Sequence, residues 1–342
     1  MLFSKKEKKM NRQILLVVFS GVCLAAMAMP ASAQPQCPPL CVTLTTINWS
    51  NSFQYDVGML PRVAAIGGNV VEVHQGGGNA GPLWYRLGSP VDLDSAGQAR
   101  INWQGSIQYD NGARPSVGGI LIQDAGEASL VEVHQAYVDV YAPLWSDGGV
   151  SLFPSPIFWW SQGQYDAGYA PAVAMDWGSL VEVHQGYWVY GPLWYHLYDG
   201  NNWGPSVEYD WGHAPSVSVS GNVFVEVHEG NNDGSLWYHV GSRNGSTITW
   251  GDSILYDSGY YPSVSVVGNT VVEVHQGGSA CPGPLWYHVG TVQGQQIVWS
   301  TSYQYDNGCS PSVATTGSLV FEVHQGSLGV GPLWSRLGFL QY

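Results

Sequence analysis

The chain has 342 residues, of which 11 are lysine or arginine and 25 are aspartate or glutamate, so its formal net charge is −14 at pH 7. All the lysines lie in the first nine residues, and the chain beyond position 33 carries six arginines against twenty-four acidic residues. Nucleic acid and anionic membrane surfaces are therefore excluded as expected partners, because both attract clustered basic side chains.

The first 33 residues predict a secretory signal peptide. Four lysines and Arg12 precede an apolar run from Ile14 to Met29, and Ala31-Ser32-Ala33 offers the small residues of a cleavage site. The run is shorter than the ~20 residues of a membrane-spanning helix, so a retained anchor is the weaker alternative. We expect a secreted or extracytoplasmic protein, in the periplasm or at the cell surface, with no membrane span after cleavage.

Residues 34–46 form an N-terminal segment, and six repeats follow over 47–342. Each repeat contains, in this order, Trp, Tyr-Asp, Pro-x-Val, Glu-Val-His and Leu-Trp. Trp precedes Tyr by six positions in every repeat, and Asp precedes Glu by sixteen in every repeat except the second, where the separation is twenty-two. Repeats one to six span approximately 47–100, 101–156, 157–200, 201–246, 247–296 and 297–342.

Each repeat is typical of four short strands separated by Gly, Asn, Pro and Asp. The strands contain, in turn, the Trp, the Pro-x-Val, the Glu-Val-His and the Leu-Trp motifs, with a turn at Tyr-Asp. We predict an all-β fold, a six-bladed β-propeller of four-stranded antiparallel blades with the Leu-Trp strand outermost. A solenoid is less favoured, because neither end of the array has a distinct cap.

Four cysteines remain after the signal peptide, and an even number in an exported chain indicates disulfides, here with three pairings open. Two of them lie in loops that this topology places on one face of adjacent blades. That placement favours a Cys281–Cys309 disulfide and leaves Cys37 to pair with Cys41.

The Glu-Val-His motif places a carboxylate and an imidazole on the same side of a strand that packs between blades. Buried carboxylates need hydrogen-bond partners, and the Tyr-Asp segment is the nearest source. We therefore predict a structural network in each blade. Its predicted members are Asp56, Glu72, His74, Asp166, Glu182, His184, Asp257, Glu273, His275, Asp306, Glu322 and His324.

Metal binding and catalysis are the alternative interpretations of the same motif. Zinc needs a third and fourth ligand, and no second histidine or cysteine is apparent beside the motif, so we predict no metal and no cofactor. Hydrolysis of glycosides needs one pair of carboxylates in one cleft, whereas the motif occurs six times. The prediction is a protein without enzymatic activity.

The Leu-Trp strand predicts ligand sites. Trp and the residue two positions later share one side, and an aromatic plane beside a hydrogen-bond donor suits a sugar ring, although such a tryptophan also serves to fill space between blades. The predicted sugar-binding residues are Trp84, Arg86, Trp194, His196, Trp237, His239, Trp286, His288, Trp334 and Arg336.

The motif order resembles that of PLL-type bacterial β-propeller lectins. The run is Pro262-Ser263-Val264, Gly268-Asn269, Val272 to His275, Leu285 to His288 and then Trp299, and the match extends over all six repeats. This chain departs from that family in the histidine after Glu-Val, in the Tyr-Asp segment and in having six repeats rather than seven. The resemblance implies a secreted or surface lectin with glycan pockets between blades.

We therefore expect a secreted carbohydrate-binding propeller with several equivalent pockets, whose partners are glycans or glycoconjugates. Fucose-binding six-bladed lectins are a second analogy, but their arginine at each site is absent here from most repeats. The alternatives are a protein-interaction scaffold at the cell surface and, less favoured, a glycoside hydrolase or lyase. An enzyme would carry one unmatched carboxylate in the central channel, and Asp124, Asp176 and Glu208 are candidates that nothing singles out.

Overall fold

The computed structural model describes residues 46–91, 98–122, 126–187, 190–230 and 233–341. All regular elements in these ranges are β-strands that pair antiparallel, in agreement with the all-β prediction. In the same ranges, no helix has the length and apolar character needed to cross a membrane. The predicted signal peptide, most of segment 34–46, and Cys37, Cys41 and Asp124 lie outside the described residues.

Four kinds of strand recur along the chain, each built around one sequence motif. The long strands begin near Tyr-Asp and run through Pro-x-Val; they are β2 (Phe53–Ile66), β6 (Ile107–Ile122), β9 (Phe158–Asp176), β12 (Val207–Ser220) and β21 (Tyr303–Thr316), with β16 (Ile254–Ser258) and β17 (Tyr260–Val267) in repeat five. The Glu-Val-His strands are β3 (Asn69–Gln75), β7 (Glu127–Gln135), β10 (Ser179–Gln185), β13 (Val223–Glu229), β18 (Thr270–Gln276) and β22 (Leu319–Gln325).

The remaining strands carry the tryptophan motifs. The Leu-Trp strands are β4 (Gly81–Val91), β8 (Ala142–Leu152), β11 (Gly191–Leu197), β14 (Ser235–Asn244), β19 (Gly283–Gln293) and β23 (Gly331–Gln341). Short strands carry the first Trp of four repeats: β1 (Thr46–Trp49), β5 (Arg100–Trp103), β15 (Thr247–Trp250) and β20 (Gln296–Trp299). Trp159 lies within β9, and Trp203 forms an isolated bridge with Tyr198.

The pairing order differs from the expected one. The second half of each long strand pairs with its Glu-Val-His strand, which pairs with the Leu-Trp strand, as in β2–β3–β4. The Leu-Trp strand then pairs with the short Trp strand and with the first half of the next long strand, as β4 does with β5 and β6. The Leu-Trp strand is therefore third rather than outermost, and the Tyr-Asp segment is strand rather than turn.

Each long strand consequently belongs to two sheets. In β2, residues Phe53–Gly58 pair with β23, and residues Met59–Ile66 pair with β3. A bulge follows Met59, where Leu60 has a positive φ of 53°. The corresponding residue before each Pro, namely Arg114, Ala170, Ala214, Tyr261 or Ser310, also has a positive φ, so the chain changes sheets at a conformation that non-glycine residues rarely adopt.

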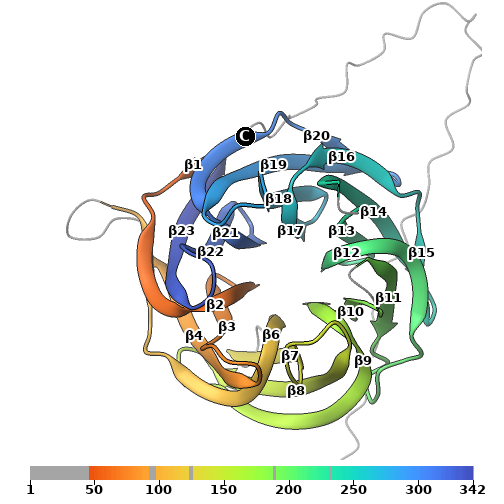
Figure 1. Cartoon of the computed structure of the whole chain (residues 1–342), viewed down its shortest axis with the longest axis horizontal. Coiled ribbons are helices and arrows are strands. Elements are labelled where there is room, and N and C mark those ends of the chain that lie inside the picture. Colours follow the sequence, from red (N-terminus) through yellow and green to blue (C-terminus); the bar gives the residue numbers. More distant parts are fainter. Residues whose placement is uncertain (1–45, 92–97, 123–125, 188–189, 231–232, 342) are drawn as a thin grey trace, which may run out of the picture. The chain divides into compact units, whose positions relative to one another are not determined.

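The strands are arranged around a common centre, with the Pro-x-Val segments innermost (Figure 1). These segments line a central cavity to which all six repeats contribute, for example Val63, Val117, Val173, Val217, Val264 and Val313. The first and last strands meet, because β23 pairs with both β1 and β2 (Figure 1).

The hydrophobic core lies between neighbouring sheets. One cluster joins Val181 and Tyr195 of repeat three to Val217 and Phe224 of repeat four. Equivalent clusters join the other consecutive repeats. A further cluster joins Val70 of repeat one to Phe321 of repeat six. Burial of Val, Leu and Tyr on these faces supplies the main favourable free energy of folding.

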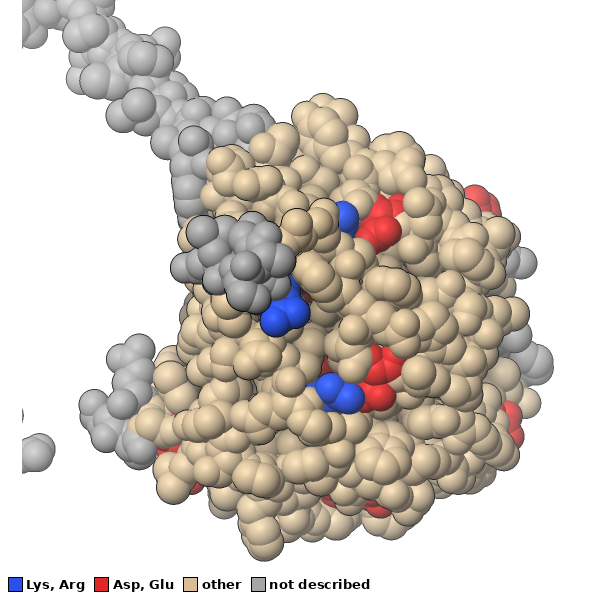
Figure 2. Space-filling model, turned by 90° about the vertical axis from the view of Figure 1, so that its left-hand side faces the viewer, with Lys and Arg blue, Asp and Glu red and all other residues tan. Residues whose placement is uncertain are grey.

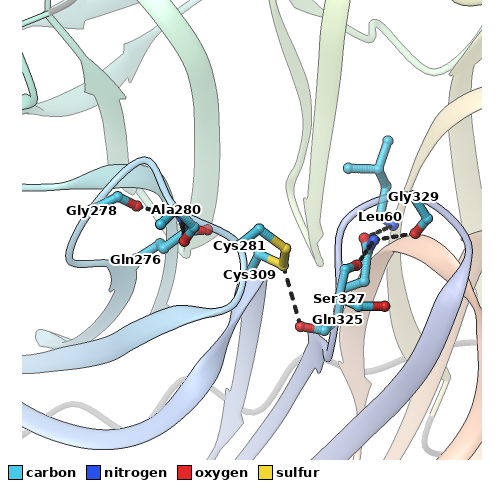
Figure 3. The surroundings of a disulfide bond; sticks show 9 residues. All are labelled: Leu60, Gln276, Gly278, Ala280, Cys281, Cys309, Gln325, Ser327 and Gly329. Atoms are coloured by element: carbon cyan, nitrogen blue, oxygen red, sulfur yellow. Dashed lines mark hydrogen bonds between the residues drawn. A yellow bond between two sulfur atoms is a disulfide. The ribbon is translucent and has the colours of Figure 1, made fainter.

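Cys281 and Cys309 form the predicted disulfide, with their Cα atoms 5.4 Å apart (Figure 3). Cys281 lies in the loop before β19, and Cys309 lies in β21 of the next repeat. The bond therefore has the predicted partners in adjacent repeats, although Cys309 lies in a strand rather than in the expected loop. Disulfides are typical of oxidising, extracytoplasmic compartments.

The disulfide closes a loop with a sequence separation of 28 residues. In the chain-entropy model, a loop of that size destabilises the unfolded state by about 3–4 kcal/mol. We therefore expect the Cys281→Ser, Cys309→Ser double variant to unfold at lower denaturant concentration under oxidising conditions. Urea denaturation of both proteins with and without reductant measures the effect. Wild type that unfolds at the same urea concentration in both conditions would contradict it.

Candidate functional site

A buried hydrogen-bond network recurs between neighbouring sheets. In every repeat the histidine Nδ1 lies 2.9–3.1 Å from the carboxylate of the Glu two residues earlier. A tyrosine hydroxyl from the adjoining sheet donates to that carboxylate at 2.9–3.0 Å in repeats one, two, four, five and six. All six glutamates are fully buried, so the imidazole and the hydroxyl replace the water that the carboxylate loses.

The aspartate of Tyr-Asp extends this network. Its Oδ2 lies 3.5–3.9 Å from the histidine Nε2 in every repeat. Its Oδ1 accepts a hydrogen bond from the next backbone N–H, as Asp56 does from Val57 at 2.8 Å. The first Trp of a neighbouring repeat packs face to face or tilted on this tyrosine in all six repeats. The ring centroids lie 4.9–5.4 Å apart.

The structure brings the predicted sugar-binding cations into this network. Arg86 Nε contacts Asp56 Oδ2 at 2.5 Å, and Arg336 Nε lies 3.3 Å from Asp306. His196, His239 and His288 are buried, and their Nε2 atoms lie 2.6–2.8 Å from Asp166, Asp210 and Asp257. A second histidine therefore does recur beside the Glu-Val-His motif, contrary to the sequence-based reasoning on metals.

Electrostatics follow from these contacts. Burial disfavours the charged form of His288, but the hydrogen bond to Asp257 and the charge of Glu273 outweigh it and raise the pKa of the imidazole. Burial also opposes ionisation of Asp257, yet the hydrogen bond from His288 and the two nearby imidazoles lower its pKa to about 2. Asp257 is thus ionised at neutral pH, and its negative charge favours the protonated form of His288.

The glycine at the fourth position of each Tyr-Asp-x-Gly segment is needed for steric reasons rather than for a turn. A Cβ on Gly58 would lie 2.5 Å from Cδ2 of His74, and the equivalent glycine of every repeat meets its own histidine at 2.5–2.6 Å. Gly58 does not have a positive φ. The imidazole packs directly against this backbone, so any larger residue would displace it.

The predicted ligand-binding tryptophans, Trp84, Trp194, Trp237, Trp286 and Trp334, are all half-buried. Each packs against the glycine that begins the loop between the Glu-Val-His strand and its own strand, as Trp286 does on Gly277. Beside Trp286, an open groove of about 260 Å³ is lined by Asp257, Ser258, His275 and Ser302. The indole therefore borders the polar network in repeat five.

A larger groove lies where the repeat pattern is interrupted. In repeat three β11 ends at Leu197, and only the Tyr198–Trp203 bridge replaces the usual short strand. The groove has a volume of about 520 Å³, and every lining residue that the structure describes is neutral. The lining comprises Trp160, Tyr165, Tyr198, Trp203, Ser146, Ser161, Gln162, Gln164, Asn201 and Asn202. Trp160 is 42% exposed.

A second groove of about 400 Å³ shares Trp160, Gln162 and Tyr198 with the first. Its other lining residues include Trp177, which is strongly exposed, and Arg243. The two grooves form one extended surface, which we name the Trp160 groove. The sequence signals were the Trp159-Trp160 pair and the short third repeat, neither of which the motif comparison uses.

The residue after Glu-Val-His also has a recurring contact. Gln325 Oε1 accepts a hydrogen bond from the N–H of Leu60 at 3.0 Å, and its Nε2 donates to Ser327 and Gly329 in its own loop (Figure 3). Gln276 donates to Gly278 and Ala280 in the same way (Figure 3). These amides fix each loop and support the positive-φ residues of the next repeat.

Repeat four has Glu229 at this position, where the other five have glutamine. Glu229 is buried and accepts a hydrogen bond from the N–H of Tyr261 at 2.6 Å. Burial raises the pKa of this carboxyl to about 7. It is therefore an unmatched, protonatable carboxyl group, but it does not line the central cavity where the sequence analysis expected one. Asp176 and Glu208 instead contact local groups, the N–H of Trp177 and the indole of Trp211.

Two arginines lie near Glu229 on the same face. Arg62, Arg114, Tyr169, His213 and Tyr261 line a narrow cavity of about 30 Å³, which holds about one water molecule. Burial and the neighbouring Arg114 lower the pKa of Arg62 to about 10. Arg114 stacks over Tyr169 at 4.3 Å, and its buried Nε has no hydrogen-bond partner in the described structure.

Basic side chains are otherwise sparse. Figure 2 shows one side of the molecule on which few basic side chains appear, and two of them lie beside acidic ones.

No protein-family model and no curated protein matches the chain. Among solved structures, it is similar to a protein of unknown function from Dyadobacter fermentans, with a TM-score of 0.53 and 11% identity over 86% of this chain and 99% of that one. It is also similar to YjhT, with a TM-score of 0.54 and 9% identity over 84% and 99%. Trypanosoma rangeli sialidase matches with a TM-score of 0.51 and 10% identity, over 83% of this chain and 55% of the sialidase.

These similarities establish an all-β, propeller-like fold. They also correct one prediction: the exclusion of enzymatic activity is wrong, because the chain shares its fold with an enzyme, a sialidase. The argument from six equivalent Glu-Val-His motifs does not exclude a single site elsewhere, and Glu229 is one carboxyl group that the repeat pattern does not account for.

Repeat two differs from the other repeats beside its aspartate. Asp147 occupies the place that arginine or histidine has in the others, next to Asp110 and His134. Burial and the neighbouring carboxylates raise the pKa of Asp147 to about 7. The folded state therefore retains this proton more tightly than the unfolded chain does. This contribution to stability is complete below about pH 4 and is lost as the pH rises to about 7.

We expect Asp147→Asn to raise Tm by about 2–4 K at pH 8 and to change it little at pH 4.5, where the native carboxyl is protonated. Thermal unfolding followed by circular dichroism at both pH values tests this expectation. The exposed Asp252→Asn serves as the control. Equal Tm changes for Asp147→Asn at both pH values would show that Asp147 does not retain its proton.

Proposed function

We propose that this protein is an exported six-bladed β-propeller that binds carbohydrate in the Trp160 groove. Pairing of β23 with β1 and β2 supports a closed ring of six blades, as does the core cluster shared by repeats six and one. The Cys281–Cys309 disulfide supports an extracytoplasmic location.

The composition of the Trp160 groove carries the proposal. Aromatic faces stack on the C–H faces of sugar rings, while amides and hydroxyls bond to ring hydroxyl groups. The groove offers four aromatic side chains together with serine, glutamine and asparagine, and its volume of about 520 Å³ accommodates a short oligosaccharide. The part of the groove around Trp203 has a neutral lining, which favours neutral sugars over charged ligands there.

The repeated tryptophans support a lectin less directly. Their companions Arg86, His196, His239, His288 and Arg336 already pair with aspartates, so they have less capacity for a sugar than the sequence suggests. The resemblance to PLL-type lectins stays a prediction. Within this proposal the repeated pockets are auxiliary, and the single Trp160 groove is the principal site.

Trp160→Ala removes an aromatic face of the groove, and we expect a loss of affinity of about tenfold, or about 1.4 kcal/mol. Trp211→Ala is the matched control, because Trp211 is 57% exposed and does not line the groove. A glycan array first identifies a bound sugar, and isothermal titration calorimetry with that sugar compares the variants.

Unchanged affinity in Trp160→Ala would remove the groove from the proposal. Loss of binding in Trp286→Ala instead would favour the repeated pockets. A mature protein that recognises no sugar at high array density would favour a protein-interaction scaffold.

A second candidate function is glycoside hydrolysis, favoured by Glu229. A carboxyl with a pKa near 7 donates a proton to a leaving oxygen at neutral pH, as a general acid must. Burial and the charge of Glu229 raise the pKa of the Tyr261 hydroxyl, and the charges of Arg62 and Arg114 lower it. All three charged groups therefore lie near Tyr261. Arg62 and Arg114 line a cavity that holds about one water molecule, so it has room for a carboxylate group of a substrate but not for a sugar ring.

We expect release of reducing sugar from an acidic oligosaccharide, with a rate that falls above about pH 7 as Glu229 loses its proton. Glu229→Gln removes the acid and lowers the rate by about 100-fold or more. Glutamine occupies this position in five repeats, so the variant is expected to fold. A panel of neutral and uronic-acid oligosaccharides at pH 5 to 8 provides the measurement.

Gln276→Glu is the control, because it introduces a carboxyl at the equivalent position of another repeat. It should retain activity in the presence of native Glu229. Full activity in Glu229→Gln, or no product from any member of the panel, would overturn the catalytic candidate without affecting the Trp160 groove.

A further inference from the structure

Repeats three, four and five each bring two histidines and an aspartate together. One ligand atom from each residue lies within 4.8 Å of the other two. We name these groups the His-His-Asp clusters; they are Asp166–His184–His196, Asp210–His228–His239 and Asp257–His275–His288. Two imidazoles and one carboxylate are a common ligand set for zinc and other divalent transition metals.

The orientation of the imidazoles matches that of metal ligands. In repeat five, the Nδ1 of His275 lies 3.1 Å from Glu273, and the Nδ1 of His288 lies 3.0 Å from the carbonyl oxygen of Ser300. Both Nδ1 atoms thus donate, to a carboxylate and to a backbone carbonyl. The two Nε2 atoms converge on Asp257 Oδ2 at 3.7 and 2.6 Å.

The other two clusters repeat this arrangement. His196 and His239 direct Nδ1 to the carbonyl oxygens of Gly204 and Gly251 at 2.7 and 2.9 Å. Their Nε2 atoms lie 2.8 Å from Asp166 and Asp210. Histidines that bind metals typically donate their other ring N–H to a carboxylate or a backbone carbonyl, which fixes the ring and its tautomer.

Repeat one places a permanent positive charge at this position. Arg86 contacts Asp56 through Nε and the carbonyl oxygen of Gln104 through a terminal nitrogen at 2.8 Å. Gln104 follows Trp103 just as Gly204, Gly251 and Ser300 follow their tryptophans. The guanidinium therefore spans the same two acceptors as the second histidine. Where histidine replaces arginine, the charge comes from a proton or from a bound ion.

The cluster of repeat five is open to solvent. Asp257 and His275 line the groove of about 260 Å³ beside Trp286. The Asp257 side chain is about a quarter exposed, and those of Asp166 and Asp210 are similarly exposed. An ion bound here could therefore keep one coordination position for water or another small ligand, as three-ligand zinc sites do.

We propose that the three His-His-Asp clusters each bind one divalent transition-metal ion of the zinc class. The aspartate Oδ2 and the two Nε2 atoms are the ligands, and the Nδ1 partners hold the imidazoles in place. This proposal is independent of the carbohydrate-binding and catalytic functions proposed above. The competing explanation is that the second histidine is a protonated substitute for arginine.

Metal binding is measured by isothermal titration calorimetry of chelator-treated mature protein with Zn²⁺ at pH 7.5 and by metal analysis after dialysis. We expect three ions per chain. His288→Arg should lower the stoichiometry to two, and this variant copies the arrangement that repeats one and six already use. Arg86→His should raise it to four, because it restores the missing ligand beside Asp56 and His74.

Cobalt provides a second readout. Co²⁺ bound by two imidazoles and a carboxylate should give visible absorption whose intensity follows the same order, two, three and four. Fewer than one tightly bound ion per chain would overturn the proposal and leave the protonated histidine as the explanation. A stoichiometry that neither His288→Arg nor Arg86→His changes would also overturn it, since the ions would then bind elsewhere.

Discussion

The structure depends on a carboxylate that is taken out of water between every pair of neighbouring sheets. Each Glu of Glu-Val-His is fully buried, and its histidine replaces solvent, together with a tyrosine from the adjoining sheet in repeats one, two, four, five and six. An unpaired buried charge would cost several kcal/mol, so the partners must be present in every repeat. This requirement accounts for the conspicuous motif spacing, for the aspartate beside the histidine and for the glycine that the imidazole packs against.

The same requirement gives the protein its functional variation. Once Glu, His, Tyr and Asp are fixed, the residue beside the aspartate is free to be arginine, histidine or a second aspartate, and the chain uses all three. Likewise, the amide after Glu-Val-His is replaced by a carboxyl group only at Glu229. Candidate sites therefore lie where one repeat differs from the others, and the shared residues serve the scaffold.

Much of the fold could be predicted from the motif spacing. Alternation of buried and exposed residues indicates strands, and the constant separations from Trp to Tyr and from Asp to Glu indicate a repeated unit, so the all-β class and the Cys281–Cys309 disulfide followed. The order of strands within a sheet could not be predicted, because a repeated series of four strands does not show which strand begins a sheet. The Gly and Pro that resemble a turn instead accompany a bulge at Leu60 and its equivalents.

The candidate site was predictable only in part. Glu72, His74 and Asp56 were grouped correctly in space, but the contact of Arg86 with Asp56 joins segments thirty residues apart and has no local signature. The Trp160 groove arises from a shortened strand, which repeat alignment treats as mere variation in length. Glu229 was visible as a single departure from glutamine, yet its significance required knowledge of its burial.

The sharing of every long strand between two sheets has a mechanical consequence. A sheet cannot detach by itself, because its innermost strand continues as the outer edge of the sheet before it. Opening at any point would bare hydrogen-bonding edges on two sides at once, and such edges attract foreign strands. The sheets should therefore separate rarely and all together, a property that suits the extracytoplasmic location proposed above.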